Sequence, residues 1–106
     1  MKIVNCKIEN YLSMPSNITS HMFFYTYVLR SEKDEQNYIG YTKNLRRRLE
    51  EHASGKNFST KPRRPLRLIY FEACLNEDDA IQRERYLKST IGRRFLSRRL
   101  YHFRRT

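Results

Sequence analysis

The chain has 106 residues, which is enough for one compact domain and too few for two. Its 22 Lys and Arg residues against 11 Asp and Glu leave a net charge of +11, so a polyanionic partner is predicted, with nucleic acid ahead of an anionic membrane. The two cysteines stand far apart without neighbouring ligand residues, and no apolar run approaches the roughly 20 residues of a membrane span, which argues against a disulfide framework, a zinc site and a membrane protein and predicts a cytoplasmic one.

Residues 1–21 are predicted to form a peripheral N-terminal extension, because they show neither helical periodicity nor sustained alternation and end in residues that favour turns. The domain itself is expected to span residues 22–106. Its basic excess is uneven: residues 1–41 carry four basic and four acidic side chains, and residues 42–106 carry eighteen and seven. A basic surface that is merely solvated is the plainer alternative, and an excess of this size speaks against it.

Two strands that form an antiparallel hairpin are predicted next. Residues 23–29 (FFYTYVL) are aromatic and β-branched, and after a polar stretch a second short strand follows at residues 38–41. Alternation places one set of side chains on one face of the sheet and their neighbours on the other. The first set is Tyr25, Tyr27 and Leu29; the second is Phe24, Thr26 and Val28.

A helix is predicted after the hairpin, capped by Thr42 or Asn44 and running to about Ser54, with Gly55 as its stop. Its apolar stripe is Leu45, Leu49 and Ala53. A basic loop follows. Residues 66–74 (LRLIYFEAC) are apolar on both faces, which predicts a central strand covered by helices on one side.

Two more helices complete the predicted domain. Asn76 can cap a helix that runs from residue 77 to about residue 90, with an acidic first turn that suits the helix dipole. Residues 92–105 alternate apolar side chains with arginines and predict one amphipathic basic helix. The expected fold is therefore α/β (α+β) in the order β-β-α-β-α-α, with a three-stranded antiparallel sheet flanked by helices.

Glu84 is an unusual residue on the first of these two helices, because it falls within the apolar face that Ala80, Leu87 and Ile91 define. A buried carboxylate is costly unless something pairs with it. An arginine from another element or a bound cation could do so. A structural salt bridge and a metal site explain Glu84 equally well from the residues alone.

Arg48 and His52 lie four residues apart on the helix before the basic loop, so they share one face. One guanidinium and one imidazole can thus point towards the sheet. Helical geometry does not separate Arg48 from Arg46. For His52, a histidine at the edge of the core with a backbone partner is the simpler interpretation than direct catalysis.

These motifs together resemble the GIY-YIG nuclease domain. The resemblance rests on residues 25–27 (YTY), 38–40 (YIG), 44–45 (NL), 48–49 (RL), His52 and Glu84, in that order over about residues 22–100. It is closest to the small stand-alone bacterial members that resemble the N-terminal nuclease domain of the excision-repair incision protein. The first motif departs from Gly-Ile-Tyr and keeps only its tyrosine.

The resemblance implies roles for five side chains. Tyr27 and Tyr38 match the two active-site tyrosines, Arg48 the essential arginine, His52 the helix histidine and Glu84 the metal ligand, which selects Arg48 over Arg46. A lone carboxylate suits Mg²⁺, with Mn²⁺ as an alternative. Arg48 would hold phosphate oxygens, Tyr27 would activate water as a phenolate, and Tyr38 would position water or phosphate. Taken singly, tyrosines on strands more often pack their rings.

The expected function is a metal-dependent endonuclease on nucleic acid, with DNA favoured over RNA and branched, nicked or damaged structures as candidate substrates. A non-catalytic nucleic-acid-binding module and a structural protein of a ribonucleoprotein particle are the alternatives. Convergence of Tyr27, Tyr38, Arg48 and Glu84 around one site would separate them. The sequence predicts no oligomeric state. The residues expected to clamp phosphates without reading bases are Lys56, Lys61, Arg63, Arg64, Arg93 and Arg94, with Arg98 and Arg99 beside them.

Overall fold

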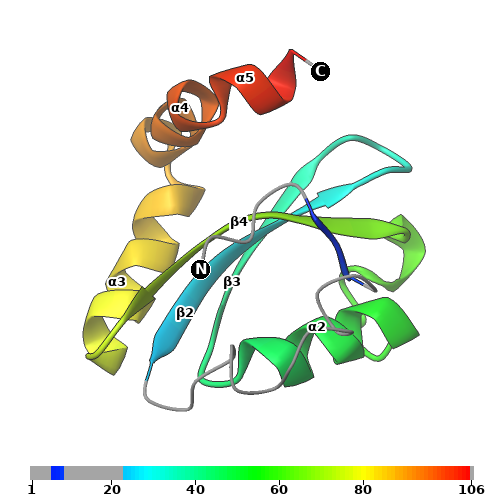
Figure 1. The fold of residues 1–106 in the computed structure, drawn as a ribbon, viewed down its shortest axis with the longest axis horizontal. Helices are drawn as coiled ribbons and strands as arrows, with labels where there is room; N and C mark the ends of the chain where they lie inside the picture. Colours follow the sequence, from blue (N-terminus) through cyan, green and yellow to red (C-terminus); the bar gives the residue numbers. More distant parts are fainter. Residues whose placement is uncertain (1–5, 9–22, 106) are drawn as a thin grey trace.

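The computed structural model describes residues 6–8 and 23–105, and it confirms the predicted α+β architecture (Figure 1). Three long antiparallel strands form the sheet: β2 (Phe24–Ser31), β3 (Asn37–Thr42) and β4 (Leu66–Cys74). A short strand, β1 (Cys6–Lys7), which the sequence did not predict, pairs with β4 and gives the order β1-β4-β2-β3. Of the three long strands the central one is β2, not the predicted residues 66–74, and β4 is an inner strand only because β1 pairs with its outer edge.

Helices cover both faces of the sheet. On one face, α2 (Leu45–Ser54) packs against Tyr25, Tyr27 and Leu29 of β2. On the other face, Val28 packs with side chains of α3 (Glu77–Lys88) and α4 (Thr90–Arg99), and Figure 1 shows these helices on the side of the sheet opposite α2. The alternation predicted for β2 is confirmed. The expectation that helices cover residues 66–74 on one side only was wrong, because Leu68 and Ile69 of β4 belong to different faces of the core.

The helix caps follow the sequence signals. The side chain of Asn44 accepts the first free N–H of α2 from Arg47, and Gly55 ends that helix in the left-handed region at a φ of 82°. Asn76 accepts two backbone N–H groups at the start of α3. A short 3₁₀ helix, η2 (Lys61–Arg63), lies in the basic loop.

The C-terminal region differs from the prediction of a single helix over residues 92–105. The side chain of Ser89 caps α4, which begins at Thr90 and ends at Arg99, and a separate short helix, α5 (Tyr101–Arg104), follows. Since α3 stops at Lys88, Ile91 leaves the apolar face on which it was predicted and is 64% exposed. A side chain at Gly92 would overlap the backbone of Tyr86 and Leu87, so glycine lets α4 turn closely against the end of α3.

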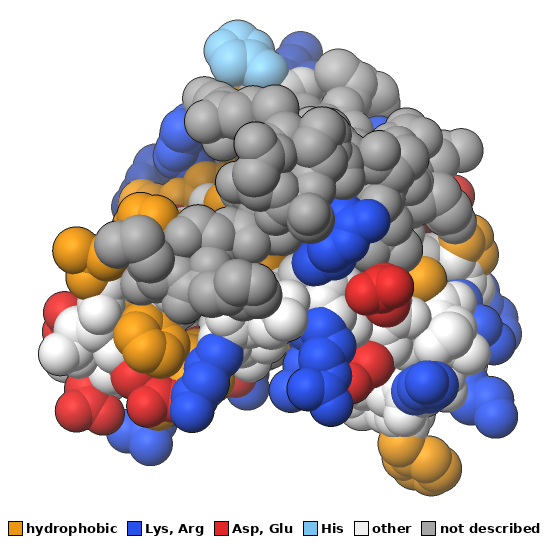
Figure 2. All heavy atoms as spheres, turned by 60° about the horizontal axis from the view of Figure 1, so that its bottom comes forward, with side chains coloured by type: hydrophobic (Ala, Val, Ile, Leu, Met, Phe, Trp, Pro, Cys, Tyr) orange, Lys and Arg blue, Asp and Glu red, His pale blue; other side chains and the backbone are white. Residues whose placement is uncertain are grey.

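The predicted N-terminal extension lies mostly outside the described residues. Its described part is β1 and Ile8, whose side chain is 1% exposed and belongs to the core between the sheet and α2. Within the described residues, no helix is both long and apolar enough to cross a bilayer. On the face that carries α2, acidic side chains lie among the Lys and Arg side chains (Figure 2).

Candidate active site

Tyr27 lies at the centre of the candidate site, because β2 is the central long strand and this side chain points towards α2. It is 1% exposed, and its hydroxyl is hydrogen-bonded to Nε2 of His52 at 2.9 Å. Its partner across the sheet is Gly40 of β3. A Cβ at Gly40 would overlap the hydroxyl and ring of Tyr27, so the glycine of the YIG motif makes room for the tyrosine of the first motif.

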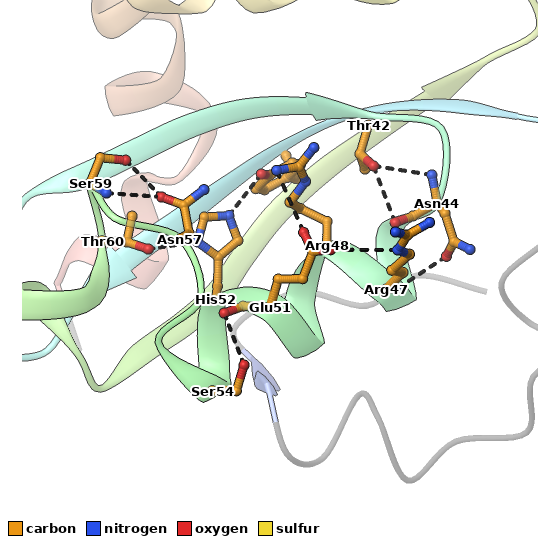
Figure 3. A network of polar contacts seen from close by, with 11 residues as sticks. Thr42, Asn44, Arg47, Arg48, Glu51, His52, Ser54, Asn57, Ser59 and Thr60 are labelled. Carbon is orange, nitrogen blue, oxygen red and sulfur yellow. Dashed lines mark hydrogen bonds and ion pairs between the residues drawn. The ribbon is translucent and has the colours of Figure 1, made fainter.

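His52 joins α2 to the basic loop. Its side chain is fully buried, and its second ring nitrogen, Nδ1, is hydrogen-bonded to Oγ1 of Thr60 at 2.7 Å (Figure 3). The backbone partner expected for this histidine is replaced by two side chains. Burial, with the positive charge of Arg48 as a smaller cause, lowers the pKa of His52 to about 4. The imidazole is therefore neutral near pH 7.

Tyr38, at the start of β3, completes an aromatic group around His52. Its ring centroid lies 5.2 Å from that of His52 and 6.4 Å from that of Tyr27. Tyr38 is half-buried, whereas Tyr27 and His52 are fully enclosed. Of the two tyrosines that the resemblance selects, Tyr38 is thus the one that solvent or a substrate reaches more easily.

Arg48 places a permanent positive charge beside this aromatic group. Its guanidinium forms an ion pair with Glu51 of the same helix, at 3.6 Å between Nη1 and Oε1 (Figure 3). The charge of Arg48 lowers the pKa of both Tyr27 and His52. The side chain is 39% exposed, so it can also face solvent. The structure therefore puts Arg48 next to Tyr27, where helical geometry alone left the choice between Arg48 and Arg46 open.

Glu84 reaches the same place from α3. Its charge raises the pKa of Tyr27, and its carboxylate pairs with Nζ of Lys88 at 3.0 Å. The expected partner from another element is thus a lysine one turn further along the same helix. The Glu84 side chain is 21% exposed, so it is partly rather than fully buried.

The pKa of Tyr27 is raised well above its usual value. Burial is the largest cause; the neighbouring Tyr38 and the carboxylates of Glu84 and Glu51 add to it, and Arg48 opposes it. Tyr27 is therefore a neutral phenol in the free protein. All five residues that the resemblance selects, from β2, β3, α2 and α3, lie near one another.

The donor set for a metal is small. Within the described parts of the chain, no group of three or more His, Cys, Asp and Glu side chains could hold a metal ion. Glu84 therefore offers one carboxylate, partly open to solvent. A cation that keeps most of its waters and takes few protein ligands, such as Mg²⁺, fits this donor set better than Zn²⁺ does.

The residues predicted to clamp phosphates divide into two groups. Lys56, Lys61, Arg93 and Arg94 are exposed. Arg63 instead pairs with Asp34 at 3.2 Å, and the guanidinium of Arg64 donates to the backbone oxygens of Ala53 and Lys61, so both tie the loop to the domain. A phosphate would have to compete with these contacts.

Sequence reasoning missed three neighbours of the site. Glu51 and Lys88 stand three and four residues after Arg48 and Glu84, and this helical spacing could have identified both as charge partners. Thr60 lies in an irregular loop eight residues after His52, and no periodic signal connects the two.

Comparison with known proteins agrees with this arrangement. A family model described as the GIY-YIG catalytic domain matches residues 23–97. A UPF0213 protein of Pediococcus pentosaceus is 48% identical over 66 residues, which are 61% of this chain and 68% of that protein. UPF0213 protein YazA of Bacillus subtilis is 41% identical over 71 residues, 66% of this chain and 69% of that protein.

Among solved structures, the solution NMR structure of UPF0213 protein BH0048 from Bacillus halodurans is 35% identical and has a TM-score of 0.46, over 71% of this chain and 82% of that one. The family model spans the hairpin, α2, β4, α3 and most of α4, and thus all five side chains around Tyr27. The chain therefore belongs to the GIY-YIG family, a family of nucleases.

Proposed function

We propose that the protein is a metal-dependent endonuclease that hydrolyses phosphodiester bonds, with DNA as its substrate. The observation that carries the proposal is the meeting of a phenol, an imidazole, a guanidinium and a carboxylate from separate elements around Tyr27. Such a set can bind a phosphate, handle a proton and hold a cation. The family assignment supports the same reaction class.

Arg48 is the residue we assign to the phosphate. Its guanidinium is planar and always charged, so it can donate two hydrogen bonds to non-bridging oxygens as negative charge grows on them. To do so it must exchange Glu51 for the phosphate. The exposed i,i+3 pair at 3.6 Å is weak enough for that exchange.

Tyr27 is the residue we assign to the attacking water, and His52 is a positioning residue for it. The hydrogen bond to Nε2 fixes the hydroxyl, and Thr60 fixes the other side of the ring. Because burial favours the phenol, Tyr27 can accept a proton from water only when added positive charge favours its phenolate. Tyr38, half-buried beside both, is placed to orient water or phosphate.

Glu84 would hold the divalent cation, with Mg²⁺ as the expected ion and Mn²⁺ as the alternative. A bound cation would supply charge that stabilises the phosphate and the leaving oxygen and favours ionisation of Tyr27. Lys88 must then release the Glu84 carboxylate, which leaves the ammonium group of Lys88 free for the substrate.

A nucleic-acid-binding module is the second candidate, and one observation favours it. Both charged groups of the proposed mechanism already have a counter-charge on their own helix, Glu51 for Arg48 and Lys88 for Glu84. A protein that only binds nucleic acid would keep these pairs intact. It would bind through its basic surface without any need for metal.

Cleavage by the Glu84→Gln variant decides between the two. Labelled single-stranded, duplex and branched DNA, with RNA alongside, would be incubated in Mg²⁺, Mn²⁺ and EDTA. We expect cutting by the wild type that needs metal, and a loss of at least about a hundredfold in the variant, with binding retained. Glu50→Gln is the control, because Glu50 is exposed on α2 and undergoes the same change of charge. Equal binding by all three proteins without cutting would leave only the binding module.

A further inference from the structure

A cleft of about 520 Å³ lies beside the proposed active site, between the β2–β3 hairpin and the C-terminal helices α4 and α5. We name it the C-terminal cleft. Figure 1 shows the hairpin and the two helices on the same side of the molecule, above the face that α3 covers. The fold holds these walls apart because α4 turns away from α3 at the close contact of Gly92.

The walls of the cleft combine positive charge with apolar surface. Four basic side chains line it against one acidic side chain, Glu35. Its floor is apolar, because Val28, Ile39 and Ile69 form the core beneath α4. The basic side chains are Arg30, Lys88, Arg93 and Arg104, and the apolar ones near the helices are Leu96, Leu100 and Phe103.

The cleft is continuous with the proposed active site through two residues. Tyr38 lines the cleft and also contacts the ring of His52. Lys88 lines the cleft and pairs with the Glu84 carboxylate. A chain that leaves a phosphate at Arg48 and Tyr27 would therefore pass Tyr38 and enter the cleft.

We propose that the C-terminal cleft binds an unpaired nucleotide of the substrate strand, next to the phosphate that is cut. Arg93, Lys88 and Arg104 hold its phosphate, and the apolar floor takes its base. The inference rests on the proposed function for the direction of the strand, and it adds the substrate class: nucleic acid that is single-stranded on one side of the cut.

The size and chemistry of the cleft favour a single strand over a duplex. Its volume lies within the range of sites that enclose one small molecule, roughly 300–1,000 Å³. A base can reach an apolar floor only when it is unpaired and unstacked, as in proteins that bind single strands. A duplex would present phosphates to the basic rim and leave the apolar floor uncovered.

The test measures binding in EDTA, where no metal-dependent cutting occurs. The wild type, Arg93→Ala and Arg98→Ala would be titrated against a fluorescein-labelled DNA single strand, the same strand without bases, and a duplex of the same sequence, over a series of salt concentrations. Arg98→Ala is a matched control, because Arg98 is an exposed arginine on the same helix that does not line the cleft.

We expect the wild type to bind the single strand more tightly than the duplex or the strand without bases. Arg93→Ala should weaken single-strand binding about tenfold and lower the slope of log K against log salt by about 0.7, as for one lost phosphate contact. The duplex affinity of Arg93→Ala, and both affinities of Arg98→Ala, should stay within about twofold of the wild type. An RNA single strand should behave like the DNA single strand.

Two results would overturn the proposal: equal losses for Arg93→Ala and Arg98→Ala on every nucleic acid, or tighter binding of the duplex by the wild type. Its failure is distinct from that of the nuclease proposal. Metal-dependent cutting with unchanged binding by Arg93→Ala would remove the cleft alone. Selective loss of single-strand binding in a protein that cuts nothing would remove the nuclease alone.

Discussion

His52 has a side-chain partner on each ring nitrogen and no contact with solvent, so its neutral form is built into the folded state. Its pKa falls from 6.5 to about 4 on folding. Between these values the unfolded chain binds a proton that the folded protein does not. The stability that His52 contributes is therefore present above pH 6.5 and lost as the pH falls towards 4.

We predict that the wild type loses about 2–3 kcal/mol of unfolding free energy between pH 7 and pH 4 because of His52. Urea denaturation over this range measures it. Carboxylates titrate over the lower part of the same range, so the His52→Gln variant is the reference: its free energy should change by that much less. Parallel pH profiles for the two proteins would show that His52 does not titrate differently in the folded state.

At the scale of single residues, what the sequence could predict depends on the distance between partners along the chain. Glu84 was correctly singled out as a carboxylate needing a partner, and its partner, Lys88, lay within reach of the same helical argument. The role of His52 was not foreseeable in the same way. Its contacts with Tyr27 and Thr60 join a strand, a helix and a loop, which only the folded chain brings together.

The pairing of β2 with β3 depends on a small residue opposite a large one. Tyr27 faces Gly40 across the sheet, and the tyrosine hydroxyl occupies the space that a Cβ at Gly40 would need. We predict that Gly40→Ala costs about 1–3 kcal/mol of unfolding free energy, because overpacking forces the ring from its position. It should also break the hydrogen bond between Tyr27 and His52, which NMR of the imidazole nitrogens would detect.

A double-mutant cycle with Tyr27→Phe checks the cause. Removing the hydroxyl relieves part of the overlap, so Gly40→Ala should be less costly in the Tyr27→Phe background than in the wild type. Equal costs in both backgrounds would mean that the glycine is needed for the β3 backbone rather than for Tyr27.

Elements with strong local signals were the predictable ones. The cap residues Asn44, Gly55 and Asn76 marked the ends of α2 and the start of α3, and residues 66–74 form β4 as predicted. The division of residues 92–105 into two helices was missed. Its signal was Ser89, whose hydroxyl oxygen accepts the N–H of Gly92 and so starts a helix before the predicted one. The two residues of β1 are too few to show any alternation.

For the whole molecule, composition and pattern predicted a basic α+β domain, and the structure adds how the site is assembled. Tyr27, Tyr38, Arg48 and Glu84 come from four elements, and neither periodicity nor spacing could show that they meet. The resemblance to a family supplied that grouping. The boundary of the domain was the other property that local patterns could not give, since a segment without periodicity can still place one side chain in the core.

Ile8 makes the domain boundary testable. It is 1% exposed and packs in the same cluster as Tyr25, Tyr27 and Leu49, although residues 1–21 were expected to lie outside the domain. We predict that Ile8→Ala lowers the unfolding free energy by about 2–4 kcal/mol, as for other buried isoleucines. Chemical denaturation measures this loss. Ile91→Ala, the same change at a residue that is 64% exposed, should cost less than about 0.5 kcal/mol.

The comparison of these two variants decides whether the extension is part of the folding unit. A large loss at Ile8 alone would mean that the strand pairing of β1 with β4 and the burial of Ile8 hold the sheet face on which Tyr27 lies. Because Tyr27 and Ile8 share one cluster, the hydrogen bond of Tyr27 to His52 should then loosen in Ile8→Ala as well. Equal, small losses at both positions would show that the domain begins after residue 21 and that the site is held by β2, β3 and α2 without help from the N-terminal segment.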